Sequence, residues 1–540
     1  MTMRATPNSQ ASLGGPARLL VLGGGGREHA LVWSLAREAT VEVVIVAPGS
    51  DAMGDEAKVR CVPGVSATDP AAVLALATSE HVDLVVVGPE AVLEAGVVDH
   101  LLTAGVAVFG PTRAAARIEW SKAFCREVAA SAGVRMARGE AFSDLGPALA
   151  FARELAGTRG SRGAVVKADG LMAGKGVTVC DDFAAAEAAL VGLFAARGAA
   201  AVRGIADPDE QPAVVIEERL VGAEASLIAL CDDHAALALP PARDHKRLLD
   251  ADAGPNTGGM GAYSPLPDLP ESLCATLIDM IHLPILAELS RRGAPFRGAL
   301  YAGLMLTPEG PVLIECNARF GDPEVQALLP RLAVPLGPLL MGAAQGDLAG
   351  ATAELGLHGR MLPTTGGAAV AIVLAAANYP ATPRKGDVIA GLDEAARVGG
   401  TVFHAGTVRG PDGNFRTDGG RVLSVVGLGS SVAAARARAE TAANCISWEG
   451  MQRRHDIAAN VSTPGAATAA AAPITAGDWE NASSGGVPNS AAHAAPKAPP
   501  VAPEGTSNRT GSADHAAPKV PPVAPEETPN STEHGGAAAT

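Results

Sequence analysis

Short apolar runs alternate with helical patterns between Arg18 and residue 118, and this alternation constrains the fold more than any other feature. The apolar runs are Leu19–Leu22, Val41–Val46, Val82–Val87 and Val106–Phe109, and helical patterns near His29–Arg37 and Pro70–Thr78 lie between them. Strands that are separated by crossover helices pair in parallel. We therefore predict an open parallel α/β domain over residues 18–118, preceded by a flexible leader at 1–17.

The rest of the chain predicts further structural units, because 540 residues exceed what one hydrophobic core accommodates. Residues 119–345 read as a mixed α+β domain with a helix near Ser121–Ala132. Its predicted strands are Ala164–Lys167, Val177–Cys180, Val214–Glu217, Ala225–Leu230, Ala299–Met305 and Val312–Glu315. Gly-punctuated strands at 368–374, 401–407 and 421–426, followed by a helix at 432–444, predict a small β-rich domain over 346–460.

Residues 461–540 are rich in Ala, Pro, Ser and Thr and carry few large apolar side chains. Such a segment does not bury enough apolar surface to offset the entropy of ordering, so we predict a disordered tail. Within it HAAPKAPPVAPE (493–504) is nearly repeated as HAAPKVPPVAPE (515–526), which favours extended polyproline-like conformations. Docking of a partner is the alternative, and composition alone supports it.

The charge and cysteine content exclude several classes of protein. A net charge of −15 argues against broad nucleic-acid binding, which needs clustered Lys and Arg. The seven cysteines are scattered and form no C-x-x-C pair, which indicates a reducing compartment without disulfides or a zinc site. No apolar run approaches the length of a membrane span, and the N-terminus lacks the apolar core of a signal peptide. We expect a cytoplasmic protein, with an organelle transit peptide as the alternative.

The glycine run Gly23–Gly26 follows the first predicted strand and opens the first helix. Backbone amides at a helix N-terminus favour an anion. The dinucleotide fingerprint G-x-G-x-x-G fails, because its last position is Glu28 when counted from Gly23 and His29 when counted from Gly24. NAD is therefore disfavoured. A phosphate on a smaller ligand fits better, and a tight turn for strand–helix packing is the alternative.

A second glycine-rich loop, Gly170–Gly176, follows the strand that ends at Lys167. Such a loop can close over a triphosphate while the ammonium neutralises it, although the segment is not a Walker A loop. The alternative is a Lys167 side chain that only extends to solvent at a strand end. Further along, Glu217–Leu220 forms a polar hinge with Glu224 beyond it, which suits either adenine and ribose or a solvated edge strand.

Asp244–Arg247 forms a charged cluster, and Gly254–Tyr263 then places four glycines in eight positions. Glycines at this density weaken regular structure and allow close approach to a small substrate, with a mobile surface loop as the alternative.

The most specific segment is Val312–Gln326, VLIECNARFGDPEVQ. Side chains alternate along a strand, so we predict that Glu315, Asn317 and Arg319 lie on one face. Two oxygen ligands for a hard cation beside a guanidinium for phosphate oxygens suit Mg-ATP.

Taken in order, these segments resemble the phosphoribosylamine–glycine ligase family of the ATP-grasp superfamily, from about Arg18 to Ile457. The matching motifs are GGGGREHAL, VGPE, FGPT, SKAF, KADGLMAGKGV, DHKR, GPNTGGMGAYSP and RFGDPE. The resemblance implies an N-terminal α/β domain, an ATP-grasp domain and a small C-terminal domain. It also implies ligation of glycine to 5-phosphoribosylamine through a glycyl phosphate, without nucleic acid or membrane partners, in a monomer with transient contacts to neighbouring purine-pathway enzymes.

Residue by residue, the resemblance implies the following contacts. ATP is expected to contact Lys122, Lys167, Gly174, Glu217, Leu220 and Glu224. Mg²⁺ or Mn²⁺ is expected at Glu315 and Asn317. Catalysis is expected to involve Arg319, Lys167, Asp244 and Lys246. Glycine and phosphoribosylamine are expected to contact Gly24, Gly25, Glu28, Gly258, Gly259, Met260 and Gly261.

Three other classes compete with this hypothesis. A carboxylase-type ATP-grasp enzyme that uses bicarbonate would keep the ATP residues but change the DHKR and GPNTGGMGAY region. A non-catalytic scaffold would be expected to lose Glu315, Asn317 or Arg319, and all three are present. A dehydrogenase conflicts with the failed fingerprint.

Deletion of residues 461–540 is expected to leave both ADP formation and the main melting transition unchanged, because the resemblance ends before this segment. Steady-state kinetics and calorimetry of the truncated protein check this. A large loss of activity or of melting temperature would show that the tail packs on the folded part of the chain.

Overall fold

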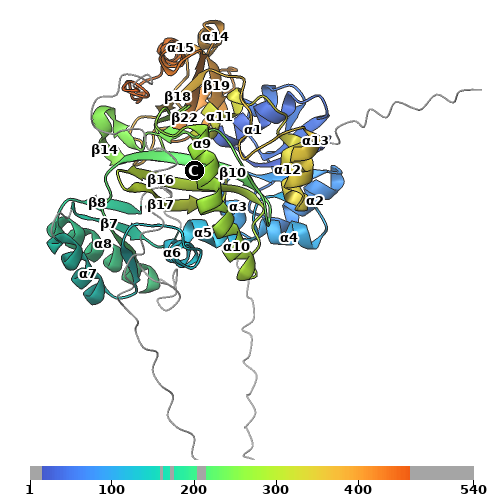
Figure 1. Cartoon of the computed structure of the whole chain (residues 1–540). Helices are drawn as coiled ribbons and strands as arrows, with labels where there is room; N and C mark the ends of the chain where they lie inside the picture. Colours follow the sequence, from blue (N-terminus) through green and yellow to red (C-terminus); the bar gives the residue numbers. More distant parts are fainter. Residues whose placement is uncertain (1–14, 159–161, 171–175, 203–213, 462–540) are drawn as a thin grey trace, which may run out of the picture. The chain divides into compact units, whose positions relative to one another are not determined.

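The computed structural model describes residues 15–158, 162–170, 176–202 and 214–461 (Figure 1). Most of the predicted leader, the tip of the second glycine loop at 171–175 and nearly all of the predicted tail lie outside the described residues. The prediction of a multidomain α/β and α+β protein is confirmed. All seven cysteines are free thiols, as their spacing indicates.

The first sheet is parallel and has the strand order β3-β2-β1-β4-β5. Its strands are β1 (Arg18–Gly23), β2 (Val43–Pro48), β3 (Val59–Cys61), β4 (Leu84–Val87) and β5 (Val108–Phe109). The helical segments between them are α1 (Gly26–Ala36), η1 (Met53–Asp55), α2 (Pro70–Ser79), α3 (Glu90–Glu94) and α4 (Val97–Thr103). Asp69 caps α2 by accepting the N–H groups of Ala71 and Ala72, which fixes where this helix begins.

A second sheet, ordered β6-β9-β7-β8, is covered by two helices and has its own small core. Its strands are β6 (Gly139–Phe142), β7 (Ala164–Ala168), β8 (Val177–Cys180) and β9 (Val214–Glu218), and its helices are α7 (Leu145–Gly157) and α8 (Phe183–Val202). Helices α5 (Arg113–Trp120) and α6 (Lys122–Ser131) connect it to the first domain. β7 and β9 pair antiparallel, with Val165 opposite Glu217.

A third sheet, ordered β11-β10-β16-β17, is antiparallel. It consists of β10 (Ala223–Cys231), β11 (Ala236–Ala238), β16 (Gly298–Thr307) and β17 (Gly310–Asn317). The helical stretch α9 (Glu271–Leu277), η3 (Ile278–His282) and α10 (Leu283–Arg291) shares a hydrophobic core with β10 and β16. This stretch alone among the described residues has the length and hydropathy of a membrane span. More than half of it (56%) is buried, as in the core helix of a globular domain.

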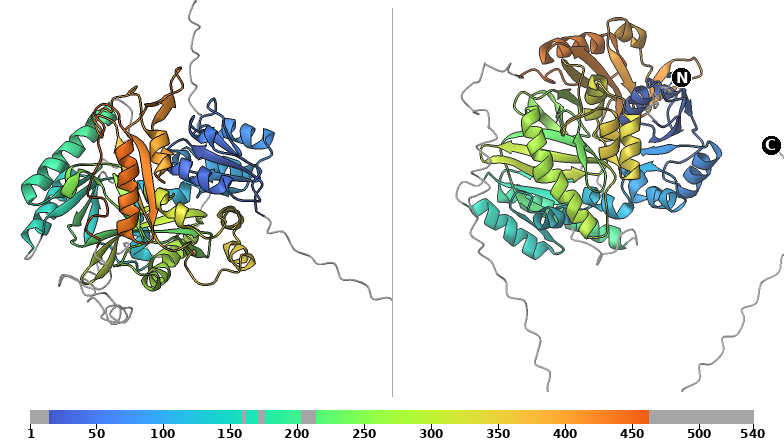
Figure 2. Two further views of the ribbon diagram at one scale, coloured as in Figure 1. Left: turned by 90° about the horizontal axis from the view of Figure 1, so that it is seen from above. Right: turned by 45° about the vertical axis from the view of Figure 1, so that its right-hand side comes forward.

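The fourth sheet, ordered β12-β15-β18-β22-β19, joins the charged Asp244 region to the C-terminal residues. Its strands are β12 (Arg243–Asp244), β15 (Gly261–Ser264), β18 (Ala368–Ala375), β19 (Thr401–His404) and β22 (Arg421–Gly429). Helices α14 (Leu392–Arg397) and α15 (Val432–Cys445) pack on it (Figure 2). Because β15 pairs with β18, this sheet crosses the predicted boundary at 345/346.

Short elements complete the described chain. They are β13 (Arg247–Leu249), η2 (Asp250–Asp252), β14 (Ala253–Asn256), α11 (Glu324–Leu328), η4 (Leu329–Arg331), α12 (Gly337–Gln345), α13 (Leu348–Glu354), β20 (Thr407–Arg409) and β21 (Phe415–Thr417). The β13–β14 hairpin includes the first residues of the glycine-dense loop, Gly254–Asn256, and α11 directly follows the RFGDP segment.

Candidate active site

The end of β17 presents Glu315 and Asn317 on its half-buried side, while Cys316 between them is buried. The prediction that Arg319 belongs to the same strand is wrong, because β17 ends at Asn317. The chain leaves the sheet where the Ala318 amide donates to the Glu119 carboxylate over 2.7 Å. Ala318 is buried and Arg319 is half-buried, so the alternation of burial along β17 continues for two residues beyond the strand.

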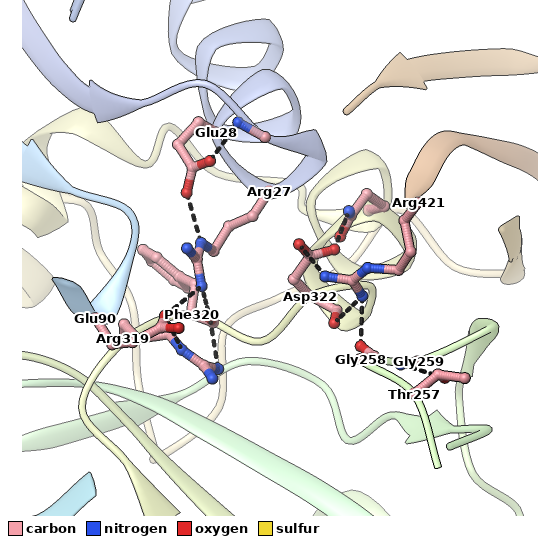
Figure 3. Close-up of polar contacts among 12 residues, drawn as sticks. Arg27, Glu28, Glu90, Thr257, Gly258, Gly259, Arg319, Phe320, Asp322 and Arg421 are labelled. Atoms are coloured by element: carbon pink, nitrogen blue, oxygen red, sulfur yellow. Dashed lines mark hydrogen bonds and ion pairs between the residues drawn. The ribbon is translucent and has the colours of Figure 1, made fainter. Parts of the chain in front are cut away.

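Arg319 is held by acidic side chains from two other segments. Its Nη2 lies 3.1 Å from Glu119 Oε1 at the end of α5. Its Nε lies 3.5 Å from Glu90 Oε2 at the start of α3 (Figure 3). These carboxylates raise the pKa of the Arg319 guanidinium against the opposing effect of burial. Arg319 is therefore a fixed cation in the ground state. Sequence reasoning gave neither glutamate a role, although Glu90 ends the VGPE motif, because both lie 200 or more residues before Arg319.

Glu315 faces a second cation, Lys246, which follows β12. Lys246 Nζ lies 3.4 Å from Glu315 Oε1 and 2.9 Å from Glu224 Oε2 at the start of β10. Lys246, followed by Lys167 and Lys122, lowers the pKa of Glu315 to about 2 despite desolvation. The low pKa keeps the Glu315 carboxylate ionised. Its side chain is 36% exposed, so the carboxylate is accessible to a cation.

Asp244 lies at the end of β12 among other acidic groups. Its pKa is raised to about 7, mainly by desolvation; Lys246 opposes this rise, and Glu324, Glu224 and Glu315 add to it. Asp244 therefore changes charge near neutral pH, as expected of a group in a functional site.

We expect kcat/KM of the reaction at this site to rise between about pH 6 and pH 8 as Asp244 ionises. The carboxyl group is mostly protonated and neutral below its pKa of about 7 and mostly ionised above it. Asp244→Asn should remove this rise of kcat/KM with pH. Asp268→Asn, at an exposed carboxylate paired with Arg243, should retain the rise. An unchanged rise in Asp244→Asn would assign the titration to another group.

Lys167 on β7 is held between two other strands. Its Nζ lies 2.6 Å from Glu217 Oε2 on β9 and donates to the Ile314 carbonyl on β17 over 2.8 Å. Glu217 also accepts from Arg126 of α6 over 2.8 Å. Lys167 thus connects the β6-β9-β7-β8 sheet to the strand that carries Glu315. Leu220 lies just beyond β9, next to the start of β10 where Glu224 pairs with Lys246.

Lys122 begins α6, whose N-terminus is capped by two oxygen-bearing side chains. Ser121 Oγ accepts the Phe124 amide, and Asp169 Oδ1 accepts the Ala123 amide over 3.2 Å. Lys122 Nζ donates to the Gly170 carbonyl over 3.4 Å, at the start of the second glycine loop. Desolvation lowers the pKa of Lys122, and Asp169 and Glu315 oppose this effect. Gly174, the remaining predicted ATP contact, lies outside the described residues.

The first glycine run packs around the Glu28 side chain. Glu28 Oε2 accepts the Gly25 amide over 2.7 Å, and Glu28 Oε1 accepts from Arg27 Nε over 2.6 Å (Figure 3). A Cβ on Gly24 would lie 2.7 Å from the Gly49 carbonyl oxygen, so this position has no room for a side chain. The tight turn that the sequence left as an alternative is therefore present. A ligand role for Gly24, Gly25 and Glu28 stays a prediction.

In the glycine-dense loop Gly258 is exposed, whereas Gly259, Met260 and Gly261 are buried. Gly259, at φ +107°, lies against Pro323. Met260 is fully buried, its amide donates to His245 and its carbonyl accepts from Val373, so the prediction of Met260 as a substrate contact has no support in the structure. Gly261 opens β15, where a Cβ would lie 2.6 Å from the Ala371 carbonyl oxygen. A substrate contact at Gly258 or Gly259 stays a prediction.

The donor set suits a hard cation that is shared with phosphate oxygens. Within the described ranges no cluster of three or more His, Cys, Asp or Glu side chains forms a metal site of its own. A carboxylate and an amide oxygen fit a metal that takes its remaining ligands from a bound nucleotide and water. Lys246, Lys167 and Lys122 around Glu315 supply the positive charge that a polyphosphate needs.

The fold and these residues define the class of protein, which is an ATP-grasp ligase. Three family models match in order: the phosphoribosylglycinamide synthetase N domain at residues 17–119, its ATP-grasp (A) domain at 120–325 and its C domain at 369–460. The chain belongs to the phosphoribosylglycinamide synthetase family. ATP-grasp enzymes use ATP with a divalent metal ion.

Named relatives agree with this assignment. The chain is 46% identical to a phosphoribosylamine–glycine ligase of Leifsonia xyli over 82% of its own length and 99% of that protein. It is 44% identical to one of Mycobacterium leprae over 82% and 97%. The crystal structure of phosphoribosylamine–glycine ligase from Thermotoga maritima covers 82% of this chain and all of that one, with a TM-score of 0.65 and 30% identity. Biotin carboxylase from Campylobacter jejuni, at 14% identity and a TM-score of 0.57 over 81% and 93% of the two chains, shares the fold.

Proposed function

We propose that this chain joins glycine to 5-phosphoribosylamine at the expense of ATP, giving glycinamide ribonucleotide, ADP and phosphate in de novo purine synthesis. The observation that carries this proposal is the end of β17. There Glu315 pairs with Lys246, Asn317 lies on the same half-buried side of the strand, and Arg319 follows among glutamates. The names of the relatives support the same substrates.

ATP is proposed to bind between the β6-β9-β7-β8 sheet and the β11-β10-β16-β17 sheet. Lys122 and Lys167 would hold phosphate oxygens, and the second glycine loop, including Gly174, would cover them. Glu217, Leu220 and Glu224 would contact adenine and ribose at the hinge between β9 and β10. Glu315 and Asn317 would hold Mg²⁺ or Mn²⁺, which neutralises phosphate charge when bound.

The chemistry follows from the weakness of a carboxylate as an electrophile. A glycine carboxylate oxygen attacks the γ-phosphorus, and ADP leaves. The phosphoribosylamine nitrogen then attacks the acyl carbon of the glycyl phosphate, loses a proton and displaces phosphate. Arg319 would stabilise charge on the transferring phosphoryl group, and Lys246 and Asp244 would orient the acceptor side. A Ser or Cys nucleophile is not required by this route.

The setting of the enzyme is also proposed. We expect a cytoplasmic monomer that makes transient contacts with neighbouring enzymes of the pathway. Sedimentation of the purified chain tests the monomer, and the metal dependence of turnover distinguishes Mg²⁺ from Mn²⁺.

An ADP-release assay with Mg-ATP tests the proposed reaction, with glycine and phosphoribosylamine omitted in turn. Full ADP formation should require both, and the product should contain the glycine carbon atoms. ADP formation that needs bicarbonate instead, or that ignores both substrates, would reject the proposal.

A further inference from the structure

The C-terminal residues hold the Gly258 peptide on both of its sides. The Gly258 amide donates to the Tyr379 hydroxyl over 2.9 Å, and its carbonyl accepts from Arg421 Nη1. Tyr379 lies shortly after β18, and Arg421 is the first residue of β22. Neither residue belongs to the motifs singled out from the sequence, and both reach the glycine-dense loop from more than 100 residues away.

The same guanidinium also holds the segment that follows Arg319. Arg421 Nη1 donates to the Asp322 carbonyl and Nη2 donates to Asp322 Oδ2, both over 2.7 Å (Figure 3). Asp322 Oδ1 accepts from Gln326 Nε2 over 2.8 Å, which fixes the carboxylate from its other side. Arg421 therefore bridges the Gly258 loop and the RFGDP segment.

The two bridged segments are in direct contact. A Cβ on Gly259 would lie 2.5 Å from Pro323 Cδ, so the loop backbone lies directly on the residue after Asp322. The Arg421 and Asp322 side chains are only 22% and 20% exposed. A partly desolvated arginine that donates to several acceptors at once is a stronger constraint than a surface ion pair, and the single ammonium of lysine does not reproduce its planar fork.

We infer that Arg421, with Tyr379, is a positioning residue that holds the Gly258–Gly259 backbone in register with Arg319. The C-terminal domain thereby sets the geometry of the acceptor side of the site, where glycine and the amine react. This inference rests on the proposed function. Nucleotide binding depends on other segments, since the Lys122, Lys167 and Glu217 contacts include neither Tyr379 nor Arg421.

Kinetics of Arg421→Ala and Tyr379→Phe test the inference. In Arg421→Ala, kcat/KM for glycine and for phosphoribosylamine should fall by about 10-fold to 100-fold, because a misplacement of about 1 Å has effects of this size. KM for Mg-ATP should change by less than about two-fold. The ratio of ADP to amide product should rise above one, because a displaced acceptor leaves glycyl phosphate to water. Arg421→Lys should recover only part of the loss, and Tyr379→Phe should show a smaller loss of the same kind.

Arg416→Ala is the matched control, because Arg416 lies on β21 in the same region and pairs with the surface residue Asp412. It should behave as wild type. Unchanged stoichiometry and kinetics in Arg421→Ala would overturn the inference. An increase in KM for Mg-ATP as large as the loss in kcat/KM for the other two substrates would also overturn it, because such an increase marks a general structural defect.

Hydrogen exchange separates this inference from the proposed function. The Gly258 amide should exchange at least about 10-fold faster in Arg421→Ala and Tyr379→Phe than in wild type, while the β17 amides keep their protection. Unchanged exchange at Gly258 in both variants would overturn the inference. A wild-type chain that releases no ADP with both substrates would reject the proposed function instead, while faster exchange would still support the positioning contact.

Discussion

Arg319→Ala is expected to lower kcat by on the order of 100-fold or more while the protein stays folded. The guanidinium is pre-positioned by Glu119 and Glu90, so it needs no reorganisation when charge develops on the transferring phosphoryl group. Steady-state ADP release at saturating substrates measures the effect. Because the loss lies in the transition state, KM for Mg-ATP should change far less than kcat.

Two variants accompany this measurement. Arg319→Lys keeps the charge but not the planar fork, so it should recover only a minor part of the activity. Arg135→Ala, at an exposed arginine that donates to the Glu309 carbonyl, should be close to wild type. Near wild-type turnover in Arg319→Ala would remove this residue from the mechanism.

Glu315→Gln is expected to be the second most damaging substitution, with a loss of about 100-fold in kcat at a fixed Mg²⁺ concentration. The variant replaces the ionised carboxylate of the proposed metal ligand, whose pKa is about 2, with a neutral amide and leaves Lys246 with one carboxylate partner fewer. A weakened metal site should also shift half-maximal activity to a higher Mg²⁺ concentration. Titration of ADP release with Mg²⁺ measures both effects.

Glu309→Gln is the control for Glu315→Gln, since Glu309 is exposed and lies just before the same strand. Its Mg²⁺ dependence should match wild type. If Glu315→Gln shows the wild-type Mg²⁺ curve and turnover, the metal site lies elsewhere.

Much of the fold followed from the sequence because continuous apolar runs mark buried strands. The runs that became β1, β2 and β4 are almost wholly buried and were predicted to within a few residues. The edge strand β3 was missed, because Val59–Cys61 is only three residues long and has no fully buried member. Strand periodicity placed Glu315 and Asn317 together, since neighbours of this kind depend only on local geometry.

The residues that hold the site in place were harder to predict, because their partners are distant in sequence. Arg319 lies beyond the end of the strand and pairs with glutamates from α3 and α5. The side-chain periodicity of a strand does not predict such a contact. Arg421 likewise contacts Gly258 and Asp322 through the topology of the fourth sheet. Met260 was assigned to substrate because it lies within a glycine-dense motif, but its side chain completes a small core with Leu248 and Val373.

A crystal structure with Mg²⁺ and a non-hydrolysable ATP analogue tests the central claim most directly. The account predicts metal density between the Glu315 carboxylate, the Asn317 amide oxygen and the β- and γ-phosphates, with Lys167 on phosphate oxygens and Arg319 beside the γ-phosphate. Phosphates bound far from positions 315, 317 and 319 would contradict it.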